Sequence, residues 1–94
     1  GGNMISKQQG SYLALLSELK NHGLPELQRL ENKLKRGSAL NDSELNHVAH
    51  WVEQTQKLAS LEQQTSQKAS WPTSGHLSEL LHNISQKALS NAQQ

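Results

Sequence analysis

Leucine supplies most of the large apolar side chains of this chain, and this restricts the possible folds more than any other feature. The sequence contains no phenylalanine, and its β-branched apolar residues are Ile5, Val48, Val52 and Ile84. Strands favour β-branched and aromatic residues, whereas helices readily accept leucine, glutamine, glutamate, lysine and alanine. A length of 94 residues leaves room for one domain. The sequence therefore predicts an all-α fold, a small antiparallel helical bundle of three to four helices.

The clearest helix start lies at Asn41. Glu44 follows three residues later, which is the spacing of a capping box, and Leu40 and Leu45 stand at the two positions of a hydrophobic staple. The staple places Leu45 in the expected core. Helical periodicity continues beyond it and predicts a long third helix at 42–69, which the Trp-Pro pair after it would stop.

Two helices are expected before this one, at 11–22 and 25–36. The segment Gly23-Leu24-Pro25 stands between them. Glycine commonly follows the last residue of a helix, and proline suits the first turn of a helix. These three residues therefore predict a tight corner, and Gly37 is expected to end the second helix.

The last helix is expected at 75–89, with Ser74 as its N-cap. Its apolar stripe excludes Leu89, which falls on another side of the helix. Residues 90–94 have nothing apolar to bury and are expected to fray. Residues 1–3 have the composition of a tag remnant, so the single helical domain is placed at 4–94.

The predicted third helix carries apolar residues on two sides. One stripe would meet the second helix, and the other would meet the first helix, the last helix or another molecule. The first stripe is Leu45, Val48, Ala49, Val52 and Ala59, and the second, roughly opposite, is Trp51, Leu58 and Leu61.

The two tryptophans, Trp51 and Trp71, allow two interpretations. Tryptophan serves either as a core anchor or as an energetic hot spot in an interface. Trp51 belongs to the second stripe, and Trp71 would either plug the end of the bundle or, if exposed, bind a partner. The candidate partner-binding residues are therefore Trp51, Leu58, Leu61 and Trp71.

The residues that could carry chemistry are few. Glu44, His47 and His50 lie close together on one predicted helix, where a carboxylate and a histidine three residues apart can share a metal ion. The same histidines could accept a phosphoryl group, as in helical histidine phosphotransfer domains. The chain has no cysteine and no glycine-rich phosphate-binding loop. No catalytic residue, resident metal or cofactor is therefore assigned.

Charge and hydropathy narrow the possible partners. The net charge of +1 argues against nucleic-acid binding, although the stretch from Arg29 to Arg36 is locally basic. No apolar run reaches the ~18 residues of a membrane span. The sequence also lacks the pattern of a secretory signal, and a cytoplasmic location is the expectation.

These observations favour a non-enzymatic protein–protein interaction module, such as an adaptor, regulator or assembly subunit, that presents an apolar helix face to a protein partner or to a second copy. An alternative comes from general shape and composition, which resemble those of small secretion and flagellar export chaperones. A further alternative is a metal-binding or phosphotransfer protein that uses Glu44, His47 and His50.

Overall fold

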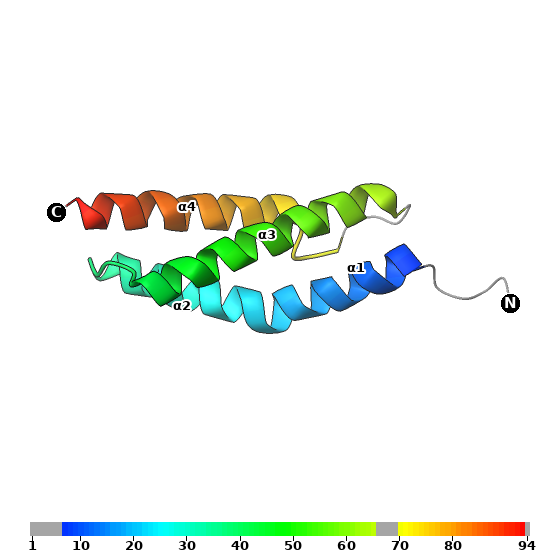
Figure 1. Ribbon diagram of the computed structural model, residues 1–94, viewed down its shortest axis with the longest axis horizontal. Helices are drawn as coiled ribbons and strands as arrows, with labels where there is room; N and C mark the ends of the chain where they lie inside the picture. The colour runs from blue at the N-terminus through cyan, green and yellow to red at the C-terminus, as the bar shows by residue number, and fades with distance from the viewer. Residues whose placement is uncertain (1–6, 66–69, 94) are drawn as a thin grey trace, which may run out of the picture.

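The computed structural model describes residues 7–65 and 70–93, and within these ranges it contains helices and no strand (Figure 1). The predicted all-α bundle is confirmed. The expectation for residues 1–3 lies outside the described residues. The helical elements are α1 (Lys7–Glu18), the short π-helix η1 (Leu19–Gly23), α2 (Leu24–Lys35), α3 (Asp42–Gln64) and α4 (Ser74–Ala92).

The first three elements, α1, η1 and α2, form one continuous helical rod, so the predicted corner at Gly23-Leu24-Pro25 is wrong. Gly23 has helical dihedral angles, φ −65° and ψ −54°. The backbone N–H of Leu24 donates to the carbonyl of Leu19, which is the wider hydrogen bond of a π-helix. Pro25 has no N–H, and its ring would crowd the carbonyl four residues earlier in an α-helix. We infer that the wider turn accommodates Pro25 without ending the helix.

Gly23 serves close packing rather than helix termination. A Cβ atom at this position would lie 3.2 Å from Cε3 of Trp51 and 3.3 Å from Cδ2 of Leu19. The indole of α3 therefore lies directly on the backbone of the rod. Gly37 does end α2, as predicted, because its φ of +87° takes the chain out of the helix.

The capping box at the start of α3 is confirmed. The backbone N–H of Glu44 donates to Oδ1 of Asn41 at 2.8 Å, and the N–H of Asn41 donates to Oε1 of Glu44 at 2.9 Å. The end of α3 was predicted too late. The helix ends at Gln64, and Thr65 is extended. The remainder of the predicted extension, residues 66–69, lies outside the described residues.

α3 runs antiparallel to the rod, and α4 runs antiparallel to α3 (Figure 1). α3 packs against α1 and α4, while α4 packs mainly against α2 and α3. We expected one apolar stripe of α3 to meet the second helix, but α3 packs mainly against α1 and α4 instead. The buried apolar side chains are Tyr12, Leu19, Leu24, Leu27, Leu30, Leu34, Val48, Trp51, Leu58, Leu77, Leu81 and Ile84.

The first turn of α4 is joined to the last turn of α3. Thr73, rather than the predicted Ser74, is the N-cap of α4, and its hydroxyl accepts from the backbone N–H of His76 at 3.1 Å. Glu62 of α3 accepts from both the backbone N–H and the hydroxyl of Ser74. A carboxylate is favoured at a helix N-terminus, so Glu62 fixes the position at which α4 begins.

The end of α4 is ordered by Asn91, so the prediction that residues 90–94 fray is wrong through Ala92. The Asn91 side chain is buried. Its Nδ2 donates to the carbonyl of Leu34 at 3.0 Å and to the carbonyl of Ser38 at 2.9 Å. The asparagine therefore satisfies carbonyls where α2 ends and the chain turns toward α3.

Candidate partner-binding surface

Two of the four predicted partner-binding residues belong to the intramolecular core. Trp51 is 5% exposed and Leu58 is fully buried, while Leu61 is half-buried. Nε1 of Trp51 donates to Oε1 of Glu26 at 3.3 Å. The stripe that carries these residues is covered by the chain's own helical rod, so Trp51 and Leu58 are not available to a partner. Their assignment to a docking surface is corrected on this point.

Trp71, the fourth predicted residue, is on the surface. It is 55% exposed, and its ring lies against that of His76 with 5.5 Å between the centroids. The neighbouring Pro72 is the residue that is buried at this end of the bundle. The backbone N–H of Ser70 donates to the Tyr12 hydroxyl at 3.0 Å, which holds this connection against α1. Trp71 thus meets the exposure condition for a docking residue, but it is not one of the residues that line the apolar hollow between α3 and α4.

Glu44, His47 and His50 have three different partners. Oε1 of Glu44 lies 2.7 Å from Nζ of Lys33, and Nδ1 of His47 lies 2.8 Å from Oε1 of Glu26. His50 packs its ring edge-on against Trp51. Within residues 7–65 and 70–93, no three histidine, aspartate or glutamate side chains are grouped closely enough to hold a metal ion. Glu44, His47 and His50 are therefore not brought together as the ligands of one metal ion.

The basic stretch at the end of α2 is partly neutralised. The hydrogen bonds from the Lys33 ammonium and the Asn41 N–H hold the pKa of Glu44 below its usual value. Nζ of Lys35 lies 3.9 Å from Oε1 of Glu31, one helical turn away. Two of the lysines are thus paired with carboxylates, which leaves a weaker positive patch than the sequence suggests.

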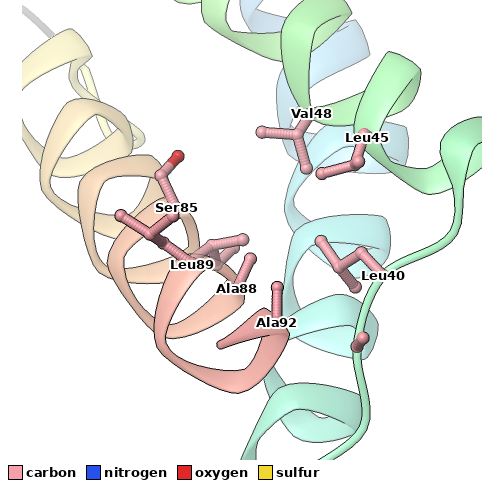
Figure 2. Close-up of a pocket in the computed structure, with 9 residues that line it drawn as sticks. Leu40, Leu45, Val48, Ser85, Ala88, Leu89 and Ala92 are labelled. Carbon is pink, nitrogen blue, oxygen red and sulfur yellow. The ribbon is translucent and has the colours of Figure 1, made fainter. Parts of the chain in front are cut away.

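An apolar hollow lies between α3 and α4, at the end of the bundle where α4 finishes (Figure 2). Its volume is about 310 Å³. We call it the end groove. Its side chains converge from the connection before α3, from the first turns of α3 and from the last turns of α4: Ala39, Leu40, Leu45, Val48, Ile84, Ser85, Ala88, Leu89 and Ala92.

Two leucines on the end groove are left in contact with water. Leu45 is 46% exposed and Leu89 is 58% exposed. The expectation that Leu45 is a core residue is therefore wrong. α3 begins beside α2 and approaches α4 only farther along (Figure 1), and the end groove lies between the first turns of α3 and the last turns of α4. Leu40, the other member of the predicted staple, is half-buried.

A second hollow of about 250 Å³ continues along the same two helices and shares Ser85 with the end groove. It is lined from α3 by Val52, Thr55 and Gln56, and from α4 by Ser78, Leu81 and His82. The two hollows follow one line along α4. The end groove is its apolar part, and the second hollow is its more polar part.

The end groove was not predicted from the sequence. One signal for it was present, because Leu89 falls outside the apolar stripe of its own helix. A large apolar residue on the solvent side of an amphipathic helix is commonplace when isolated. It becomes informative here because Leu45 and Leu40, far away in the sequence, lie across the same hollow.

Comparison of the chain with protein-family models, with curated proteins and with solved structures returns no match. Among the helices of the described residues, none is long and apolar enough to cross a membrane.

Proposed function

We propose that this protein is a non-enzymatic protein–protein interaction module that binds apolar side chains of a partner helix in the end groove. The observation that carries the proposal is the groove itself, a hollow of about 310 Å³ lined almost entirely by leucine, isoleucine, valine and alanine. Recognition of a helix by an apolar groove is a recurring mode of protein association. In this mode the protein is an adaptor, a regulator or an assembly subunit.

The size of the end groove suits side chains rather than a whole small molecule. An apolar cavity of about 150 Å³ holds one benzene molecule, so about 310 Å³ accommodates roughly two apolar groups of that size. The exposed faces of Leu45 and Leu89 would be covered at the same time. Removing apolar surface from water stabilises a complex by about 25 cal/mol per Å².

Site-specific photo-crosslinking tests this proposal. A photoreactive phenylalanine analogue replaces Leu89 in the protein as expressed in its own cells. We expect discrete adducts after irradiation, and we expect the additional substitution Ala92→Arg to abolish them by filling the groove. The matched control places the same analogue at Leu13, a leucine of α1 that is similarly exposed, at 48%. Equal adduct patterns from positions 89 and 13, or no adduct from position 89, would refute the proposal.

The sequence also suggested two alternative functions. The export-chaperone interpretation stays a prediction, and it is a special case of the proposed function in which the partner helix belongs to an export substrate. For the metal-binding alternative, the described residues bring no three histidine, aspartate or glutamate side chains together, and the phosphotransfer alternative stays a prediction.

A further inference from the structure

We infer that the occupant of the end groove is a second copy of this chain, with Leu89 of each copy inserted into the end groove of the other. This inference rests on the proposed function and specifies its partner. It makes the protein a two-fold symmetric dimer joined along α4. The end groove is then incomplete in one chain, because the partner copy supplies the side chain that fills it.

The first support is that the surface carries a protruding side chain and a hollow together. Leu89 is 58% exposed on the same groove that has room for about two apolar groups. A two-fold interface uses the same patch on both copies, so the patch must fit itself. A side chain that protrudes beside its own receiving hollow meets this requirement.

The second support is electrostatic. The sequence of α4 contains two formally charged residues, Glu79, which lies ten residues before Leu89, and Lys87. Lys87 lies on the other side of the helix, beside Glu31 and Lys35 of α2. Two copies can therefore bring their α4 helices together without opposing like charges, which would otherwise destabilise a self-pairing surface.

The third support is the spacing of the exposed residues along α4. Ser78, His82, Ser85, Leu89 and Ala92 are all exposed, and they follow one another at intervals of four and three residues. The spacing is that of one face of a helix, and this face is the one that lines the end groove and the second hollow, so a helix packed along it would cover both. The line from 78 to 92 is about 21 Å long at 1.5 Å per residue. Three of the five residues are serine or alanine, so a second helix can approach closely.

The dimer is expected to be concentration-dependent. A contact line of this length between two helices, with one inserted leucine per copy, belongs to the class of interfaces that bury less than about 1,200 Å² in total. Such interfaces are typical of transient association. Sedimentation velocity across a range of protein concentrations is therefore the appropriate measurement, with light scattering for the mass at each end of the range.

The decisive variants are Leu89→Glu and Leu13→Glu. Both replace an exposed leucine by the same charged residue, but Leu13 lies on α1 and lines neither the end groove nor the second hollow. We expect Leu89→Glu to raise the dimer dissociation constant at least tenfold while circular dichroism and thermal unfolding show an intact helical fold. We expect Leu13→Glu to leave the dissociation constant unchanged. A wild-type chain that stays monomeric up to millimolar concentration, or equal effects of the two variants, would overturn the inference.

The absence of cysteine from the chain allows a positional test. Protein carrying Leu89→Cys is mixed with protein carrying Leu45→Cys and oxidised gently, and the yield of the mixed disulfide is compared with that from Leu89→Cys and Leu13→Cys. The inference expects a higher yield for positions 89 and 45, because Leu45 lines the groove that Leu89 enters. Equal yields would contradict it.

The binding of a partner in the end groove and the formation of a dimer can be refuted separately. An adduct from position 89 with twice the mass of the chain supports both the proposed function and the dimer. An adduct between position 89 and a different polypeptide, sensitive to Ala92→Arg, supports the proposed function and overturns the dimer. The absence of any adduct, together with a monomeric chain in solution, overturns both.

Discussion

Replacement of Gly23 by alanine tests the packing of the rod against α3. Gly10 provides the comparison, because both glycines have helical neighbours on either side and alanine changes both in the same way. Alanine is favoured over glycine inside a helix by about 1 kcal/mol. At Gly10 a new Cβ meets nothing within 4 Å. Gly10→Ala is therefore expected to raise the free energy of unfolding by up to ~1 kcal/mol.

At Gly23 the same gain is opposed by a steric cost. The new Cβ would lie 3.2 Å from Cε3 and 3.3 Å from Cζ3 of Trp51. The indole cannot move away freely, because it is buried and its Nε1 donates to Glu26. Overpacking of a well-filled core costs about 1–3 kcal/mol. The net effect of Gly23→Ala is a loss of roughly 0–2 kcal/mol after the helix-forming gain of ~1 kcal/mol is subtracted.

Chemical denaturation followed by circular dichroism gives both free energies of unfolding. A double-mutant cycle with Trp51→Phe then isolates the contact, since the smaller ring removes the benzo edge that approaches Gly23. In that background we expect Gly23→Ala to become neutral or stabilising. If Gly23→Ala stabilises the wild-type protein as much as Gly10→Ala does, then Trp51 does not lie on the rod and the description of the core is wrong.

Three other outcomes are expected. Asn91→Ala should lower the free energy of unfolding by about 1–3 kcal/mol in denaturation experiments, because it removes the amide donor to the Ser38 carbonyl and one of the donors to the Leu34 carbonyl, which also accepts from the Gly37 N–H; a loss within error would mean that water replaces the amide. Leu45→Ala should cost about 1 kcal/mol, whereas Leu58→Ala, at a fully buried site of the same helix, should cost about 2–5 kcal/mol, and equal costs would contradict the exposure of Leu45. The pKa of Glu44 is lowered in the folded state, so its contribution to stability is complete above its ordinary value of 4.5 and is lost as the pH falls through the lowered value; acid titration of the unfolding midpoint should show this loss in the wild type and less of it in Glu44→Gln.

The parts of the fold that were predicted correctly depend on residues close together in the sequence. The capping box joins Asn41 and Glu44, which are three residues apart. Gly37 ends α2 through its own φ. Each of these devices is complete within one helical turn, so the sequence contains all the information that it needs.

The errors concern residues whose partners are distant in the sequence. Gly23 was interpreted as a helix end because glycine commonly serves that purpose, but its constraint comes from Trp51 on another helix. Asn91 was assigned to a fraying tail, and its two acceptors lie 57 and 53 residues before it. Neither relation has a periodic or compositional signal along the chain.

Only part of the candidate site could be predicted from the sequence. The two apolar sides of α3 were recognised, but which of them faces water depends on the angle at which α3 crosses its neighbours. The side with Trp51 and Leu58 is covered by the rod, and the side with Leu45 is left partly open beside α4. Amphipathic periodicity gives the direction of an apolar face and does not give the neighbour that covers it.

The contrasting surroundings of the two tryptophans provide the molecule with two optical reporters. Trp51 is enclosed and hydrogen-bonded at the centre of the helical contacts, whereas Trp71 is open to solvent where the chain turns between α3 and α4. An aqueous quencher such as iodide should therefore reach the emission of Trp71 and leave that of Trp51 largely intact. Single-tryptophan variants would then resolve loosening of the turn from loss of the interior within one fluorescence experiment.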